Sequence, residues 1–469
     1  MYRRVAIIGG GAAAATLLSE LLERQPAQPL HLDWFTGGGA PGRGVAYGTR
    51  SERHLLNVRA ASMSMFASKP RGFLEFAQRG DGSIAGTDFL PRRLYGDYLE
   101  AEVERALERA KSLGHDVNVI PFKVDSLVPE HDGVTILHGE ESTHVDAAVL
   151  ALGALPPQPL SGVSDAAIAS GRYVVDPWSF LAQAEPDPAP RKIVLIGLGL
   201  TAVDVVLELA AVWPNATFTA ISRHGLLPEA HLSSASAPAD DGADLIEAMR
   251  AAPDIRTWMR LLRDAIAHSS DWRVVIDSMR PHTPSLWQEL PREERARFLR
   301  HVRWAWERAR HRMAPQVMAQ MEELERAGRF HRERARLHAA DVEGDHLHLS
   351  ITPTGSSTPQ AMDADLVIQT IGLNTDVRRT GHTLVRQLAT NGHITPDPQG
   401  LGCMSTKEGR LQHDGATWPH LYAMGSLLRG TFWESTAMPE IRQQARQMAD
   451  ILLAGQEEKR RHRAAEERR

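Results

Sequence analysis

The sequence has a single cysteine, Cys403, among its 469 residues. A lone cysteine cannot form an intramolecular disulfide, a CxxC redox pair or a cysteine zinc cluster. This excludes disulfide reductases that use a cysteine pair. The HExxH pattern and paired His/Asp spacings are also missing, so we expect no metal site.

Long apolar runs are missing as well. No segment approaches the roughly 20 consecutive apolar residues that a membrane-spanning helix needs. The first apolar run begins at Val5, which leaves no room for the charged and apolar regions of a signal peptide. We therefore expect a cytoplasmic protein without a membrane partner.

The chain has little excess charge of either sign. Its formal net charge is −5 and its pI is near 6.5, so it has no bulk attraction for nucleic acid, and we expect none as a partner. The hydrophobic fraction of 42% and the charged fraction of 24% are typical of globular proteins. At 469 residues the chain is long enough for two or three domains.

Two glycine-rich turns of the same type are the most informative feature that is present. One is Gly9–Ala14 and the other is Gly197–Ala202. Each follows a short apolar run, Val5–Ile8 or Ile193–Ile196, and each opens a helical pattern. A strand, a glycine-rich turn and a helix in this order are typical of dinucleotide binding. The sequence therefore predicts two dinucleotides on one polypeptide.

Each position in such a turn has its own physical role. The first glycine, Gly9 or Gly197, lets the chain turn tightly out of the strand. The second, Gly11 or Gly199, has no side chain, so backbone N–H groups can approach a pyrophosphate. The third position, Ala14 or Ala202, allows close packing of helix and strand. The positive end of each following helix then faces the phosphates.

The remaining pattern predicts an α/β protein with two Rossmann-like domains. We expect further strands at 30–35, 117–120, 134–137, 146–153, 346–351, 365–372 and 421–426, and helices at 95–111 and 438–453. Between 239 and 333 the composition becomes charged and aromatic. Phe298, Val302, Ala305 and Ala309 share one helical face there, which predicts a helical insertion.

Proline-rich stretches at 156–159 and 186–190 punctuate this order. We expect the first part of one domain at 1–158, the second domain at 159–362 with its insertion at about 239–333, and the second part of the first domain at 363–455. The charged run at 456–469 is expected to be a tail without function.

The order of motifs resembles the two-dinucleotide flavoproteins, in which an FAD domain is split by an inserted NAD(P)H domain. Gly42–Ala46 with Tyr47, and His54–Ala60 with Met63-Ser64, resemble a bacterial FAD–NAD(P)-binding group related to N-hydroxylating monooxygenases. Thr431–Ala437 followed by Pro439–Arg442 is similar to the C-terminal signature of that group. The resemblance covers nearly the whole chain and implies FAD and NADPH as cofactors.

The resemblance also implies which residues bind FAD. Gly9, Gly11 and Ala14 would cradle the pyrophosphate, and Asn57 and Met63 would lie near the flavin. The implied site further includes Thr36, Arg43, Val124, Gly153, Gly425, Ser426 and Thr436. One departure concerns the acid that usually ends the second strand and binds ribose. Here that strand ends in Phe35-Thr36, and Asp33 comes early.

For the second dinucleotide, the expected residues are Gly197, Gly199, Thr201, Ala202, Ser222, Arg223 and Gly372. The strand at 218–221 ends in Ser222-Arg223-His224 where an acid is usual. A guanidinium at this place pairs with a 2′-phosphate and favours NADPH over NADH. The alternative is that Arg223 is an exposed residue at a strand end.

The sequence offers fewer candidates for catalytic residues than for cofactor-binding residues. Asn57 and Arg280 are the two we single out, Arg280 because arginine forks match carboxylate geometry and could clamp an anionic substrate. The arginine and tryptophan run at 304–312 is compatible with the same role or with a solvated helical face. His224, His231, His282 and His311 titrate in a useful range, but the chain has 21 histidines. At Val175 the histidine of the Baeyer–Villiger fingerprint is missing, which argues against that reaction.

The resemblance implies an FAD- and NADPH-dependent monooxygenase that oxidises a small substrate, an amine or amino-acid nitrogen, with O2 through a flavin C4a-hydroperoxide. Two other functions stay open from the residues alone. One is an NAD(P)H-dependent flavin dehydrogenase or reductase without oxygen transfer. The other is a non-catalytic, redox-responsive binding protein.

Overall fold

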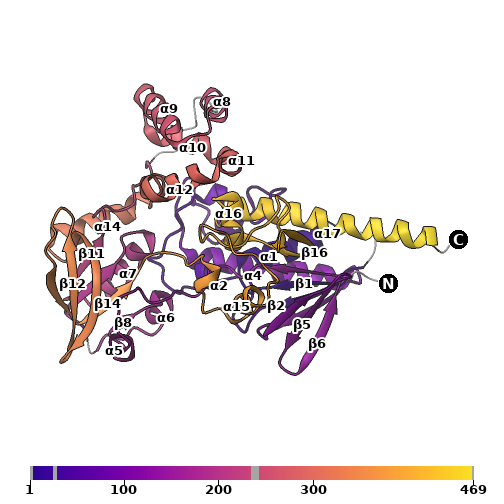
Figure 1. Ribbon diagram of the computed structural model, residues 1–469, viewed down its shortest axis with the longest axis horizontal. Coiled ribbons are helices and arrows are strands. Elements are labelled where there is room, and N and C mark those ends of the chain that lie inside the picture. Colours follow the sequence, from indigo (N-terminus) through magenta and orange to yellow (C-terminus); the bar gives the residue numbers. More distant parts are fainter. Residues whose placement is uncertain (1–3, 25–28, 188, 234–241, 467–469) are drawn as a thin grey trace.

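The computed structural model describes residues 4–24, 29–187, 189–233 and 242–466. Two lobes built on β-sheets lie side by side, and a helical lobe stands above them (Figure 1). The C-terminal helix α17 (Met438–Glu466) begins in the middle of the molecule and extends outward (Figure 1).

The first sheet is assembled from both ends of the chain. Its strands lie in the order β15 (Arg410–His413), β16 (Ala416–Ala423), β7 (Ala147–Leu150), β1 (Arg4–Ile8), β2 (His31–Phe35) and β3 (Asp116–Ile120). All neighbours pair in parallel except β15 with β16. Strands β1, β2 and β7 are buried apolar runs because both faces of the sheet are covered.

Helices cover one face of this sheet and a small sheet covers the other. Helices α1 (Ala12–Glu23), α4 (Arg92–Ser112) and α17 share one core with alternate residues of β1. The opposite face packs against α15 (Thr383–Thr390) and the antiparallel sheet β4 (Ser126–Pro129), β5 (Val134–His138) and β6 (Glu141–Val145). The short helices α2 (Gly44–Tyr47) and α3 (Gly72–Gly80) lie beside α4.

The second sheet lies in the middle part of the chain. Its order is β13 (Gln360–Ala364), β12 (His346–Pro353), β11 (Phe330–Glu343), β10 (Thr217–Ser222), β9 (Lys192–Ile196), β14 (Leu366–Gln369) and β8 (Tyr173–Val174). Helices α7 (Leu200–Val212) and α14 (Pro315–Arg326) pack on one face. The short helices α5 (Asp165–Ala169) and α6 (Pro177–Leu181) complete this lobe.

The strand pairing shows that one predicted domain boundary is misplaced. We expected the first domain to resume at residue 363, but β14 pairs in parallel with β9 and belongs to the second sheet. The two predicted strands at 146–153 and 365–372 have equivalent places in different sheets, because β7 pairs with β1 and β14 pairs with β9. The return to the first domain therefore comes after Gln369.

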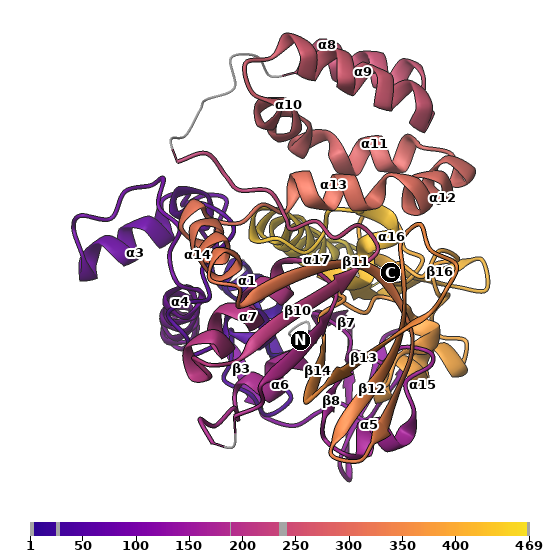
Figure 2. The ribbon, with the colours of Figure 1, turned by 90° about the vertical axis from the view of Figure 1, so that its left-hand side faces the viewer.

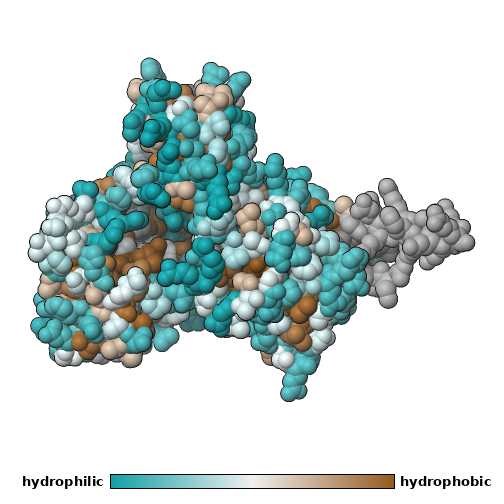
Figure 3. All heavy atoms as spheres, in the orientation of Figure 1, coloured by the Kyte–Doolittle hydropathy of each residue, from teal (hydrophilic) through white to brown (hydrophobic). Residues whose placement is uncertain are grey.

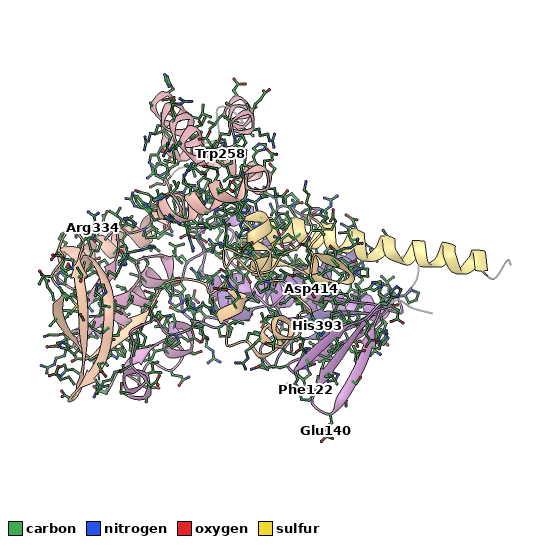
Figure 4. The ribbon with its side chains drawn as sticks, viewed as in Figure 1. Phe122, Glu140, Trp258, Arg334, His393 and Asp414 are labelled. Carbon is green, nitrogen blue, oxygen red and sulfur yellow. The ribbon has the colours of Figure 1, made fainter. Side chains whose placement is uncertain are left out.

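Among the described residues the helical lobe contains six α-helices and stands apart from the two sheets (Figure 2). They are α8 (Ala243–Ala251), α9 (Ile255–His268), α10 (Trp272–Met279), α11 (Thr283–Glu289), α12 (Arg292–His301) and α13 (Arg303–Arg310). The lobe is shorter than the insertion predicted at about 239–333, because α14 and β11 pack in the second domain. The expected continuous face from Phe298 to Ala309 is broken, because α12 ends at His301 and α13 begins at Arg303. Trp258, labelled in Figure 4, belongs to the core of this lobe, and residues 239–241 of the predicted insertion lie outside the described residues. The lobe contacts the first domain through α11 and α16 (Arg429–Phe432).

Candidate functional site

The first glycine-rich turn joins β1 to α1 and fits a bound pyrophosphate. A Cβ on Gly9 would lie 2.2 Å from the carbonyl oxygen of Ala151, and one on Gly10 would lie 2.3 Å from that of Thr36. Gly11 is the N-cap of α1, and no side chain caps the helix. The N–H groups of the first turn are thus available to an anionic ligand.

The predicted Gly153 and Ser426 follow β7 and β16, which belong to the same sheet as β1. The Ser426 hydroxyl donates a hydrogen bond to the carbonyl oxygen of Gly153, which ties the ends of β16 and β7 together. The Gly425 N–H donates to Gln444 Oε1 at 2.9 Å. Met63 and Val124 are buried in two different hydrophobic cores. Their contact with a flavin stays a prediction.

Arg43 does not fit its predicted role. Its Nε donates to Glu100 Oε1 at 2.7 Å and its Nη2 to Glu100 Oε2 at 2.6 Å, and Asp97 accepts a further bond. The hydrogen bonds that Arg43 donates to Glu100 raise the pKa of Arg43 against the opposing effect of burial. The guanidinium therefore joins α2 to α4, and its fork is already occupied by carboxylates.

Asp33 lies too early in β2 to reach a ribose at the strand end. Its carboxylate is fully buried and accepts from Arg4 Nε at 2.6 Å and from Asn118 Nδ2 at 3.0 Å. The end of β2 carries Phe35 and Thr36, as the sequence indicated. The usual ribose-binding acid is absent from this strand.

Asn57 contacts the segment that leads into the helical lobe. Its backbone carbonyl accepts a hydrogen bond from His231 Nε2 at 3.0 Å. Burial, reinforced by the charge of Arg312, lowers the pKa of His231 to about 3. The neutral imidazole thus holds the Asn57 loop of the first domain against the entrance to the insertion.

The second glycine-rich turn repeats the geometry of the first. Gly197 has a φ of +115°, and a Cβ there would lie 2.5 Å from the carbonyl oxygen of Thr370. Gly199 is the N-cap of α7 without a side-chain cap, and a Cβ there would meet nothing within 4 Å. The space over the first turn of α7 is open to a ligand. Ala202, the third position, is buried against the sheet.

A cavity of about 630 Å³ lies over this turn and reaches all three lobes. The second domain contributes the predicted Gly197, Gly199, Thr201, Ser222, Arg223 and Gly372. The helical lobe contributes Arg303, Trp304, Glu307, Arg308 and His311, and the first domain contributes Arg429, Trp433, Glu434 and Thr436. In Figure 3 hydrophobic residues gather in the hollow between the second-sheet lobe and the helical lobe. Thr436, which we assigned to FAD, thus shares a cavity with the second turn.

Trp433 occupies a strained backbone conformation at this cavity. Its φ of +58° is unusual for an aromatic residue, which costs on the order of 1–3 kcal/mol. The indole packs against Trp287 and Phe298, each with a ring separation of 5.1 Å. This packing holds the strained residue in place, and such strain gathers at functional sites.

Glu434 follows Trp433 and presents a buried carboxylate to the cavity. Its Oε1 accepts from Trp306 Nε1 at 3.0 Å, and Arg310 Nη2 lies 3.8 Å from Oε2. Burial pushes the pKa of Glu434 upward, but Arg310, His311 and the Trp306 bond outweigh it and hold the pKa below its ordinary value. Glu434 is therefore an anion at neutral pH and a poor general base.

Arg280 does not act as the predicted anion clamp. Its Nε and Nη2 donate to the two carboxylate oxygens of Glu440 at 2.7 and 2.9 Å. This bidentate pair uses the fork that a substrate carboxylate would need. The structure thus makes Arg280 a link between the helical lobe and α17.

Of the four candidate histidines, His224 and His311 line the cavity. The His224 ring stacks on Trp304 with a separation of 4.2 Å, which joins the end of β10 to α13. Burial lowers the pKa of both imidazoles, so both are neutral near pH 7. No sequence pattern predicts that Arg303 and Arg429 also line this cavity, because the helices that carry them, α13 and α16, meet only in the folded chain.

Known proteins share the sequence pattern of the first domain and the fold of the chain. Residues 6–155 match the FAD-NAD(P)-binding family. The fold is similar to that of ornithine N-hydroxylase from Kutzneria sp. 744, with 15% identity, a TM-score of 0.63, and coverage of 97% of this chain and 100% of that one. It is also similar to L-lysine 6-monooxygenase from Pseudomonas syringae, with 16% identity, a TM-score of 0.65, and coverage of 96% and 99%.

Disulfide reductases share the same architecture. The bacillithiol disulfide reductase of Staphylococcus aureus matches with 14% identity, a TM-score of 0.56, and coverage of 97% of this chain and 99% of that one. No curated protein matches the chain by sequence. Residues 6–155 therefore form an FAD-NAD(P)-binding domain, and the similarity to solved structures confirms the predicted fold class.

Two features are missing from the part of the chain that the structure describes. No helix among residues 4–24, 29–187, 189–233 and 242–466 is long and apolar enough to cross a membrane. The same part of the chain holds no group of three or more His, Cys, Asp or Glu side chains placed to bind a metal ion.

Proposed function

We propose that this protein is an FAD- and NADPH-dependent monooxygenase that hydroxylates the nitrogen of a small amine or amino acid. The observation that carries the proposal is the shared cavity. The glycine-rich turn of the second domain and the Trp433–Thr436 segment of the FAD domain line one space of about 630 Å³. A hydride donor and a flavin must meet in such a space, and ligand sites are common between domains.

In this proposal each glycine-rich turn holds one dinucleotide. Gly9 and Gly11 with the first turn of α1 hold the FAD pyrophosphate, and Gly197 and Gly199 with the first turn of α7 hold that of NADPH. Arg223 is exposed at the end of β10 and lines the cavity, which supports pairing with the 2′-phosphate.

Bound FAD supplies hydride acceptance from NADPH and activation of O2, which no side chain of the protein can provide. The protein itself contributes shape, charge and exclusion of water. The helical lobe covers the cavity with Trp304, and Trp433 forms part of its wall. The anionic Glu434 cannot take up a proton readily, so the substrate amine must lose its proton elsewhere or bind as the free amine.

Fold similarity to ornithine and lysine hydroxylases favours oxygen transfer over simple electron transfer. The competing function is a reductase, since disulfide reductases share the fold. Reduction of a disulfide through a cysteine pair is excluded because Cys403 is the single cysteine. Cys403 is also fully buried, and burial raises the pKa of its thiol to about 12.

The test is to supply NADPH and 18O2 to the FAD-loaded protein with a panel of amines and amino acids. We expect one class of substrate to accelerate NADPH oxidation and to gain one 18O atom on nitrogen. Accelerated NADPH oxidation that produces only hydrogen peroxide or a reduced substrate would favour a dehydrogenase or reductase. No stimulation by any amine would contradict the proposal.

A further inference from the structure

Two guanidinium groups share a single carboxylate oxygen in the wall of the cavity. Arg303 Nε donates to Glu307 Oε1 at 3.0 Å, and Arg429 Nη2 donates to the same atom at 2.8 Å. All three side chains line the cavity. Because two positive charges face one negative charge, the trio of Arg303, Arg429 and Glu307 carries one net positive charge.

Two other charged residues of the cavity, Arg308 and Glu434, have partners that lie behind its wall. Arg308 pairs with Glu229, and Glu434 has Arg310 within 3.8 Å. Neither Glu229 nor Arg310 lines the cavity. The excess positive charge toward the helical lobe therefore comes from Arg303 and Arg429.

The guanidinium groups are held on an aromatic surface. The Arg429 guanidinium lies 4.4 Å from the ring centre of Trp433, and that of Arg303 lies 5.7 Å from it. Such stacking orients a planar fork, and each guanidinium uses only one of its nitrogens to donate to Glu307, unlike the bidentate pairs of Arg43 and Arg280. The Arg429 side chain is only 12% exposed, so its charge has lost most of its hydration. Burial, followed by the repulsion of Arg303, lowers the pKa of Arg429, which is the effect of an undercompensated charge.

We propose that Arg303 and Arg429 bind a carboxylate of the substrate, so that the substrates of this protein are amines that also carry a carboxylate group. The proposal rests on the proposed function and names its substrate class. The ligand is an oxyanion, and a phosphate of NADPH is the other possible source of one. We assign the nucleotide phosphates to the second domain, where Arg223 and Arg336 line the cavity from β10 and β11.

The experiment measures ligand binding to the FAD-loaded protein saturated with NADP⁺, so that it does not depend on turnover. Succinate and acetate serve as carboxylate probes and putrescine as a cationic amine, with calorimetry as the readout. The variants are Arg303→Gln, Arg429→Gln and Glu307→Gln. Arg300→Gln is the matched control, because Arg300 is exposed on the neighbouring helix α12. FAD content and the thermal midpoint establish that each variant is folded.

We expect the carboxylates to bind and putrescine to bind at least tenfold more weakly. Each arginine variant should weaken carboxylate binding at least tenfold, whereas the Arg300 control should not change it. Glu307→Gln should strengthen binding several-fold, because it removes the negative charge that competes for both guanidinium groups. Unchanged carboxylate binding in both arginine variants, or a loss in Glu307→Gln equal to theirs, would overturn the inference.

NADP⁺ affinity separates the two sources of an oxyanion. If the arginine variants weaken NADP⁺ binding as much as succinate binding, the pair serves the nucleotide and the inference is wrong. Loss of succinate binding with unchanged NADP⁺ affinity supports it. Both results stand whether or not the protein proves to transfer oxygen, so failure of the monooxygenase proposal would be seen separately in the 18O2 experiment.

Discussion

Gly199→Ala should abolish binding of the pyridine nucleotide while leaving the fold intact. Gly199 has an extended backbone, with φ −92° and ψ −170°, that any residue can adopt. A Cβ at this position meets no atom within 4 Å. The methyl group therefore fits the free protein, but it occupies the space through which a pyrophosphate approaches the N–H groups of α7.

The effects of Gly199→Ala on stability and on nucleotide binding differ in size. Alanine is a poorer N-cap than glycine but restricts the unfolded chain more, and these terms oppose each other, so stability should change by less than about 1 kcal/mol. A hydrogen bond to a charged group contributes about 1.5–3 kcal/mol, and loss of two such bonds to the phosphates would weaken binding on the order of 100-fold or more.

Gly197→Ala provides the contrast within the same turn. Its φ of +115° is unfavourable for alanine, and the Cβ would lie 2.5 Å from the Thr370 carbonyl oxygen. We expect this variant to lose at least about 3 kcal/mol, which lowers the thermal midpoint by roughly 6 °C or more or prevents folding.

The assay combines thermal unfolding, FAD content and the KM for NADPH. Gly199→Ala should keep its midpoint within about 4 °C of the parent protein and retain FAD, yet require far more NADPH. An NADPH KM within threefold of the parent value would refute the assignment of the second turn to the nucleotide. Loss of FAD together with NADPH binding would also contradict it, because the first turn is untouched.

Three further predictions concern other parts of the site and its support. Arg223→Ala should raise the KM for NADPH by about 10-fold or more and that for NADH little, and equal effects on both would remove the 2′-phosphate role. Asp204→Ala leaves Arg92, 2.7 Å away across the two domains, as a buried unpaired charge, and should cost about 3–5 kcal/mol by thermal unfolding, whereas Glu75→Ala at an exposed pair should cost less than about 0.5 kcal/mol. His231 has a folded pKa of about 3 against an ordinary 6.5, so its contribution to stability is complete above pH 6.5 and falls by about 1.4 kcal/mol per pH unit as the pH drops from there toward 3. His231→Gln should flatten this acid-side loss in unfolding curves between pH 5 and 7, and an unchanged slope would show that another group causes it.

Local features were predictable from the sequence because they depend on neighbours in the chain. The turn at Gly9 directly follows the apolar run Val5–Ile8 and opens the helix that begins at Ala12, so a short stretch of sequence is enough to predict it. The buried strands 146–153 and 365–372 were visible as apolar runs for the same reason. Their membership in different sheets was not, because pairing of β14 with β9 joins residues about 170 positions apart.

Charge partners were the part of the site that sequence patterns could not supply. Arg43 and Arg280 both had the chemistry of an anion-binding residue, but Glu100 and Glu440 occupy their forks. Arg303 and Arg429 had no distinguishing pattern, yet they converge on one oxygen of Glu307. Whether an arginine is free to bind a ligand depends on which carboxylates the fold brings to it.

The sequence by itself determined that this protein has two glycine-rich turns, each between an apolar run and a helical pattern, and no cysteine pair, because these follow from short motifs and composition. The resemblance implied a split first domain, and the sheet order shows that both ends of the chain share one sheet. The tertiary structure decided that the second turn, the helical lobe and the Trp433 segment share one cavity. It also decided which charges in that cavity are balanced. Packing between lobes sets both, since it brings together side chains that lie more than 100 residues apart in the sequence.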